Sequence, residues 1–116
     1  MAKILSVQHL ALRPGVQPEA FEQFLDRAMP ALTRWPGMKS YVAKGDRGDR
    51  AGHYTLIFEF DDVATRNRYF PQADVLGPEA QQHLAAWLPF VTEWQQYATW
   101  AGSPTVFTDY VVLGEF

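Results

Sequence analysis

The sequence predicts an α+β fold built around an antiparallel sheet, and three observations support this. Apolar and polar residues alternate over 3–12, 38–45, 53–61 and 104–116, which is the pattern of half-buried strands. Between these segments, apolar residues recur every three or four positions, as on one face of a helix. Pro-Gly and Gly-rich turn signals separate the two kinds of segment.

The first half of the chain shows a strand, a helix and a strand. The strand over 3–12 ends at the turn signal Arg13-Pro14-Gly15, and a helix is expected over 18–35. Pro18 suits the first turn of that helix, and Pro36-Gly37 ends it. A bend is expected within the helix at Pro30.

The stretch 43–53, "AKGDRGDRAGH", joins the second and third strands and contains two Gly-Asp-Arg repeats. A phosphate-binding loop opens into a helix, whereas this loop leads into a strand. Its Arg-Gly-Asp tripeptide resembles an adhesion signal, but nothing marks the chain as secreted. The stretch is therefore interpreted as a hairpin bend with its charges in water.

The second half predicts a short helix over 62–70, capped by Asp61 or Asp62, and a long helix over 78–100 with a kink at Pro89. The resulting order β-α-β-β-α-β favours a ferredoxin-like sandwich with helices on one face of a four-stranded antiparallel sheet. The whole chain, 1–116, is expected to form this single domain. The other sheet face would be bare and apolar, which predicts a partner that covers it.

The amino-acid composition disfavours or excludes several kinds of partner and functional site. The net charge of −3 and the lack of a basic stripe disfavour nucleic acid as a partner. The chain has no cysteine, which excludes disulfides, a thiolate nucleophile and a thiolate metal site. No apolar run approaches the roughly 20 residues of a membrane span, and the opening segment is interpreted as a strand. We therefore expect a soluble, cytoplasmic protein with no membrane partner.

Three local features carry a resemblance to a known superfamily: "QHLALRPGVQPEAFEQFL", "WPGMKSYVAKGD" and "YTLIFEFDDVATRNRYF". With the order of elements, they resemble the dimeric α+β barrel superfamily over nearly the whole chain. The resemblance implies a homodimer whose sheet faces join into a barrel, with a pocket between sheet and helices in each subunit. The superfamily includes cofactor-free antibiotic-biosynthesis monooxygenases, polyketide cyclases, haem-degrading enzymes and stress-responsive proteins.

The resemblance leaves the catalytic residues open. The monooxygenase branch uses an Asn on or beside the first strand, whereas this strand offers Gln8 and His9. None of that branch's catalytic roles is therefore assigned to this chain.

Three titratable residues are candidates for catalysis. His9, on the first strand, is a possible general base, and the alternative is a hydrogen-bonded core histidine. His83, in the long helix, is a possible base or haem ligand, and the alternative is ordinary packing against tryptophan. Glu59 lies in mid-strand, where burial by a second subunit would require a partner for its carboxylate, and the alternative is exposure to water.

Aromatic side chains are candidates for the lining of a ligand pocket. The candidates for this role are Tyr41 on the second strand and Trp87 and Trp94 in the long helix. Their alternative is core or interface packing. No histidine has close metal-ligand spacing to another, and no metal or cofactor is expected.

Two functions follow from these observations. The first is a homodimer that binds a small apolar or aromatic molecule, as a cofactor-free monooxygenase or a polyketide-cyclase-like enzyme. The second is a non-enzymatic, dimeric binding or stress-related protein whose aromatic residues serve core and interface.

Overall fold

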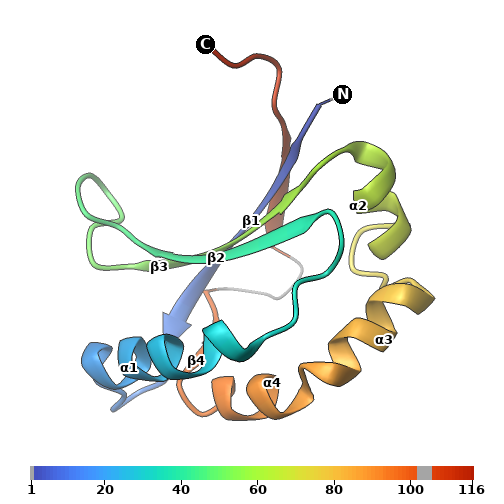
Figure 1. The fold of residues 1–116 in the computed structure, drawn as a ribbon. Helices are drawn as coiled ribbons and strands as arrows, with labels where there is room; N and C mark the ends of the chain where they lie inside the picture. Colours follow the sequence, from blue (N-terminus) through green and yellow to red (C-terminus); the bar gives the residue numbers. More distant parts are fainter. Residues whose placement is uncertain (1, 102–105) are drawn as a thin grey trace.

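Strand β1 (Ile4–Leu12) lies in the middle of the sheet in the computed structural model, which describes residues 2–101 and 106–116 (Figure 1). β1 pairs antiparallel with β3 (Tyr54–Phe60), and β3 pairs antiparallel with β2 (Met38–Lys44). On its other side, β1 pairs with β4 (Ala98–Trp100) and with β5 (Phe107–Val111). The order β2-β3-β1-β4/β5 confirms the ferredoxin-like α+β arrangement.

Within the described residues the sheet has five strands where four were predicted, because two short strands share one position beside β1. β4 pairs with Leu10–Leu12, and β5 pairs with Ile4–Gln8. The strand predicted over 104–116 is confirmed only as β5. Positions 104 and 105 lie outside the described residues, and the strand ends at Val111.

The first helical region is shorter than predicted. α1 (Pro18–Ala28) is followed by the 3₁₀ turn η1 (Met29–Ala31), in which Pro30 occupies the first turn. Proline lacks an N–H and clashes with the preceding turn, so the α-helix ends just before it rather than bending. α2 (Val63–Tyr69) agrees with the prediction, and the Asp62 side chain caps it by accepting from the Thr65 N–H at 2.7 Å.

The long helix predicted over 78–100 is in fact two helices and a strand. α3 (Pro78–Ala86) and α4 (Leu88–Trp94) are separated at Trp87, and Pro89 lies in the first turn of α4. A proline is favourable there and unfavourable inside a helix, which accounts for the break. Residues 98–100, predicted as helix, form β4. Among the described helices, none has both the length and the apolar character to cross a membrane.

The core lies between the helices and one face of the sheet (Figure 1). Alternate residues of the strands point to this helix side, which buries Ile4, Leu10 and Phe60 almost completely. From the helices, Phe21 and Phe24 of α1 pack into one cluster with Leu10, while Tyr69 of α2 packs into the other with Ile4 and Phe60. The odd-numbered residues of β1 and β3 point to the opposite face.

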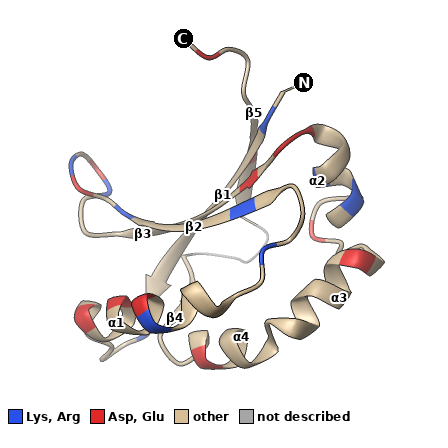
Figure 2. Cartoon of the chain, viewed as in Figure 1, with Lys and Arg blue, Asp and Glu red and all other residues tan. Residues whose placement is uncertain are grey.

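The hairpin between β2 and β3 confirms the interpretation of "GDRGDR" as a bend. Gly45 and Ala51 form an isolated bridge, and Gly48 and Gly52 have positive φ. The side chains of Arg47 and Asp46 are in water, being 95% and 97% exposed, whereas Arg50 is half-buried and donates to the Tyr54 carbonyl at 3.1 Å. Figure 2 shows charges of both signs at this tip and along α1, whereas α2 carries basic groups.

A set of polar contacts links α1 to the sheet next to the hairpin between β2 and β3. Glu22 Oε2 accepts from Lys44 Nζ at 2.8 Å and also from the Tyr54 hydroxyl. The hydrogen bond from Lys44, followed by that from Tyr54, holds the pKa of the Glu22 carboxyl below its ordinary value. The ionised carboxylate therefore stabilises the folded state.

This contact predicts acid sensitivity. Because the folded-state pKa of Glu22 is lowered, its contribution is complete above the unfolded-state pKa of about 4.3 and is lost as the pH falls from there through the lowered folded-state pKa. We expect Glu22→Gln to flatten the fall in Tm over this range, measured by circular dichroism. Asp49→Asn, in the exposed hairpin tip, is the control and should retain the wild-type slope. An unchanged slope in Glu22→Gln would contradict the assignment.

Two glycines with similar positive φ predict different losses of stability on substitution by alanine. Gly37 and Gly15 have φ of 76° and 83°. A Cβ on Gly37 would lie 2.9 Å from Thr65 Cγ2, whereas a Cβ on Gly15 would meet nothing within 4 Å. Each alanine variant should lose about 1–2 kcal/mol of unfolding free energy from its left-handed backbone. Gly37→Ala should lose more, because Thr65 in α2 has to move.

Urea denaturation measures both losses. Equal losses for Gly15→Ala and Gly37→Ala would show that the contact with Thr65 has no energetic weight.

Candidate functional site

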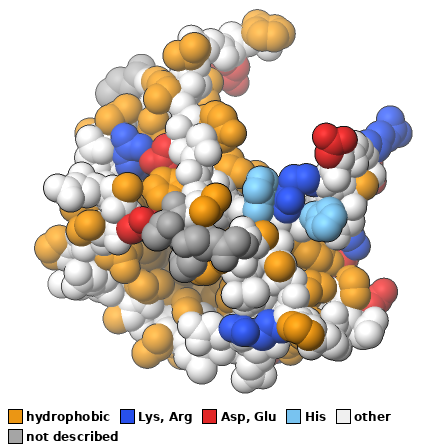
Figure 3. All heavy atoms as spheres, turned by 180° about the vertical axis from the view of Figure 1, so that it is seen from behind, with side chains coloured by type: hydrophobic (Ala, Val, Ile, Leu, Met, Phe, Trp, Pro, Cys, Tyr) orange, Lys and Arg blue, Asp and Glu red, His pale blue; other side chains and the backbone are white. Residues whose placement is uncertain are grey.

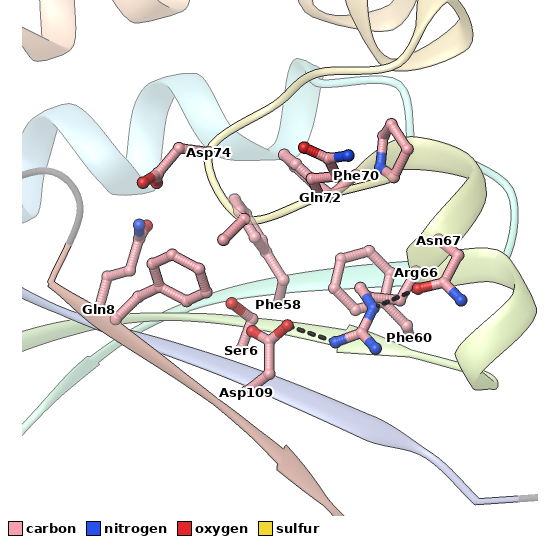
Figure 4. A pocket seen from close by; sticks show the side chains of 13 residues that line it. Ser6, Gln8, Phe58, Phe60, Arg66, Asn67, Phe70, Gln72, Asp74 and Asp109 are labelled. Carbon is pink, nitrogen blue, oxygen red and sulfur yellow. Dashed lines mark hydrogen bonds and ion pairs between the residues drawn. The ribbon is translucent and has the colours of Figure 1, made fainter.

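A cavity of about 300 Å³ lies between the helix side of the sheet and the segment from α2 to Asp74 (Figure 4). The sheet contributes six of the lining residues: Ser6, Gln8, Phe58, Phe60, Phe107 and Asp109. The rest come from α2 and the chain after it: Arg66, Asn67, Phe70, Pro71, Gln72, Ala73 and Asp74.

The alternation of β1 explains why space remains at this position. Ile4 and Leu10, on the helix side, are fully packed, but Ser6 and Gln8 lie between them on the same side. Ser6 pairs with Phe58 of β3 and with Asp109 of β5, so these residues share that side of the sheet. A small and a polar side chain where the pattern calls for large apolar ones leave the sheet surface unfilled.

Four phenylalanines give the cavity an apolar, aromatic wall. Phe60 lies edge-on to Phe70 with ring centroids 6.0 Å apart and also edge-on to Phe58 at 6.4 Å. Phe107 of β5 completes the set. Such rings bind flat apolar molecules by offset stacking and edge contacts.

An ion pair forms the polar wall of the cavity. Arg66 Nη1 of α2 donates to Asp109 Oδ2 of β5 at 2.5 Å, and Arg66 Nε donates to Asn67 Oδ1 at 2.9 Å. The side chains of Arg66 and Asp109 are each 23% exposed, so the pair is largely shielded from water. Figure 4 shows both groups between Ser6 and Phe60. The other carboxylate oxygen, Asp109 Oδ1, is buried and has no hydrogen-bond partner among the described residues.

Three of the predicted site residues lie on the opposite, bare face of the sheet. His9 is exposed, with Nδ1 3.3 Å from Thr55 Oγ1, and Tyr41 is 43% exposed. The side chain of Glu59 is 17% exposed and lies between two lysines. Its Oε2 is 3.9 Å from Lys3 Nζ and 4.0 Å from Lys39 Nζ.

The other three predicted residues lie on the helix side, within the packing. His83 stacks on Trp35 with ring centroids 5.5 Å apart. The indole of Trp87 donates to the Thr33 carbonyl at 2.9 Å, and Trp94 packs edge-on against Phe21 at 5.4 Å. The sheet separates these three from His9, Tyr41 and Glu59, so the six do not meet in one pocket. None of the six is among the described residues that line the cavity.

The sequence interpretation missed the residues that do line the cavity. The position of Arg66 and Asn67 in a short polar helix predicts that they are surface residues, yet both line the cavity. A usable signal was present in β1, where Ser6 and Gln8 occupy helix-side positions between Ile4 and Leu10. Polar residues at core positions of a strand mark either a partnered buried group or a site.

The acidic and histidine side chains do not gather into a metal centre within residues 2–101 and 106–116. No group of three or more such side chains that could hold an ion occurs there. The cavity wall offers aromatic rings, side-chain amides, the Ser6 hydroxyl, the Asp74 carboxylate and the Arg66–Asp109 pair.

No family model matches the chain. No curated protein matches its sequence.

Solved structures do share its fold. The chain is similar to SnoaB, a cofactor-independent oxygenase from Streptomyces nogalater, with a TM-score of 0.52 and 15% identity, covering 100% of this chain and 96% of that one. It is also similar to an uncharacterized NIPSNAP-like domain protein from Burkholderia xenovorans, with a TM-score of 0.58 and 17% identity, covering 97% and 85% of the two chains. At these identities the comparisons show a common ferredoxin-like α+β fold.

Proposed function

We propose that the chain binds a small aromatic molecule in the cavity between the sheet and α2, and that it does so as a homodimer. The observation that carries the proposal is the cavity itself: about 300 Å³, four phenylalanines and a shielded ion pair. Ligand sites commonly combine an apolar, aromatic lining with a few polar groups that set orientation.

The size of the cavity limits the ligand. A volume of about 300 Å³ is at the lower end of the range for small-molecule sites, which favours a ligand of roughly one to three fused rings. The phenylalanines would contact the ring faces and edges, while Ser6, Gln8 and Gln72 offer hydrogen bonds to substituents.

The bare sheet face supports the homodimer. Leu5, Val7 and Ile57 point to this face and are only half-buried. They belong to neither core cluster in the part of the chain that the structure describes. The view from behind shows many hydrophobic side chains at the surface, with acidic, basic and histidine side chains among them (Figure 3).

A second copy is the partner proposed for this face, because it presents the same apolar residues. A two-fold contact places one patch against its own copy, and two sheets pack face to face about 10 Å apart. Tyr41 and Tyr110, which are 43% and 54% exposed, would then be covered. The joined sheets would form the barrel that the resemblance implies.

Cofactor-free oxygenation or polyketide-type cyclisation of the bound molecule is the second candidate function. The fold shared with SnoaB, a cofactor-independent oxygenase, supports it, as does the presence of an ionisable carboxylate, Asp109, at the wall of an aromatic cavity. A side chain that removes a proton from the substrate would be required. His9 and His83 remain proposed bases, although both lie outside the cavity lining.

Oxygen uptake and product formation, measured with a panel of naphthols and anthrones, test this second function. Unchanged turnover in both His9→Ala and His83→Ala would remove these residues from the reaction. Binding without turnover over the whole panel would leave the non-enzymatic alternative.

The binding proposal predicts that a bulky side chain in the cavity blocks the ligand. Ala73 lines the cavity in the exposed segment after α2, whereas Ala86 is exposed at the end of α3 and is not part of the lining. A ligand at 100 times its Kd stabilises the folded state by about 2.7 kcal/mol. We expect 2-naphthol to raise the Tm of the wild type and of Ala86→Trp, but not of Ala73→Trp, in a thermal shift assay.

Two results would oppose the binding proposal. An equal shift in Ala73→Trp would place the ligand elsewhere. The absence of any shift over a panel of one- to three-ring aromatic compounds would favour a purely structural role for the aromatic residues.

The dimer proposal predicts that a charge on the bare face separates the subunits. Ile57→Lys places an ammonium group in the centre of the proposed interface, which should weaken association about a hundredfold or more. Leu88→Lys is the control, because Leu88 is 58% exposed on α4, on the helix side. Sedimentation velocity at micromolar concentration should show dimers for the wild type and for Leu88→Lys, and 13.2 kDa single chains for Ile57→Lys. Single chains in all three samples would contradict the proposed homodimer.

A further inference from the structure

The carboxylate of Asp109 is incompletely satisfied at the cavity wall. Its Oδ2 accepts from Arg66, whereas Oδ1 is buried and lacks a hydrogen-bond partner among the described residues. Buried acceptors without a partner are uncommon, and one in a cavity wall invites a donor from a ligand. The terminal torsion of aspartate is broad, so a small rotation can turn Oδ1 toward a bound molecule.

The neighbouring groups determine what kind of donor fits. A carboxylate paired with arginine only accepts hydrogen bonds, so the ligand must supply the hydrogen. The cavity holds Arg66, Asp109 and Asp74, and one positive and two negative charges sum to −1. The guanidinium already donates to Asp109 and Asn67. An anionic ligand would therefore meet net repulsion.

We propose that Asp109 Oδ1 accepts a hydrogen bond from a hydroxyl or N–H group on the aromatic ligand, so that the site selects neutral donors such as phenols and aromatic amines. The proposal rests on the proposed function, since it assumes that an aromatic molecule occupies the cavity. It goes further in naming the substituent that the cavity selects and the residue that selects it. Aromatic ethers leave Oδ1 without a partner, and aromatic carboxylates add a repelled charge.

Three two-ring probes of similar size test this selection: 2-naphthol, 2-methoxynaphthalene and 2-naphthoate. Isothermal titration of the wild type should give 2-naphthol roughly 10- to 100-fold higher affinity than 2-methoxynaphthalene, the range expected for a hydrogen bond to a charged acceptor. The affinity for 2-naphthoate should be the lowest of the three.

Asp109→Asn tests the assignment to this residue. The affinity of this variant for 2-naphthol should fall at least tenfold, while its affinity for 2-methoxynaphthalene should change less than threefold. The ratio of the two affinities reports the hydrogen bond alone, because general damage to the cavity would lower the affinity for both probes by a similar factor. Thr92→Ala, at an exposed position of α4, is the control and should bind both probes as the wild type does.

The outcomes separate this inference from the proposed function. Equal wild-type affinities for 2-naphthol and its methyl ether, both abolished by Ala73→Trp, would overturn the role of Asp109 and leave aromatic binding in place. A wild-type preference that persists in Asp109→Asn would also overturn it. Failure of all three probes to bind would overturn both proposals. The wild-type comparison needs no variant, so the test remains decisive even if Asp109→Asn does not fold.

Discussion

The alternation of side chains along β1 is the constraint on which the rest of the structure depends. Because β1 pairs on both sides, its register fixes which residues of β3 and β5 share each face of the sheet. Ile4 and Leu10 on one face anchor the helices, and Leu5 and Val7 on the other form the bare apolar face. A shift by one residue would exchange the two faces and remove both the core and the cavity.

Local signals in the sequence were sufficient to predict most of the helices and strands. The turn glycines, the proline at the start of α1 and the capping Asp62 determine where elements begin and end, and their effects extend over only a few residues. The split of the last strand position could not be predicted in this way. Whether residues 98–100 continue a helix or form β4 depends on pairing with Leu10–Leu12, far away in the sequence. Pro89 signalled a kink, but the same residue also suits the start of a new helix.

The cavity was harder to predict than the fold because its residues have ordinary local contexts. Histidines and tryptophans drew attention as chemically capable side chains, yet Trp87 and Trp94 are used in packing. Arg66 is typical of an exposed helix residue, and only the tertiary approach of α2 to β5 brings it against Asp109. Burial of an arginine by a distant strand leaves no periodic pattern in the sequence.

The division of the outer strand into β4 and β5 also affects how molecules of this chain can meet. An unpaired sheet margin exposes a row of backbone donors and acceptors on which another strand can grow, and long straight margins promote fibrils. Here one margin consists of strands of three and five residues, and the other, β2, carries Lys39 and Lys44. Both features oppose lateral strand addition, so open-ended stacking of sheets side by side is disfavoured.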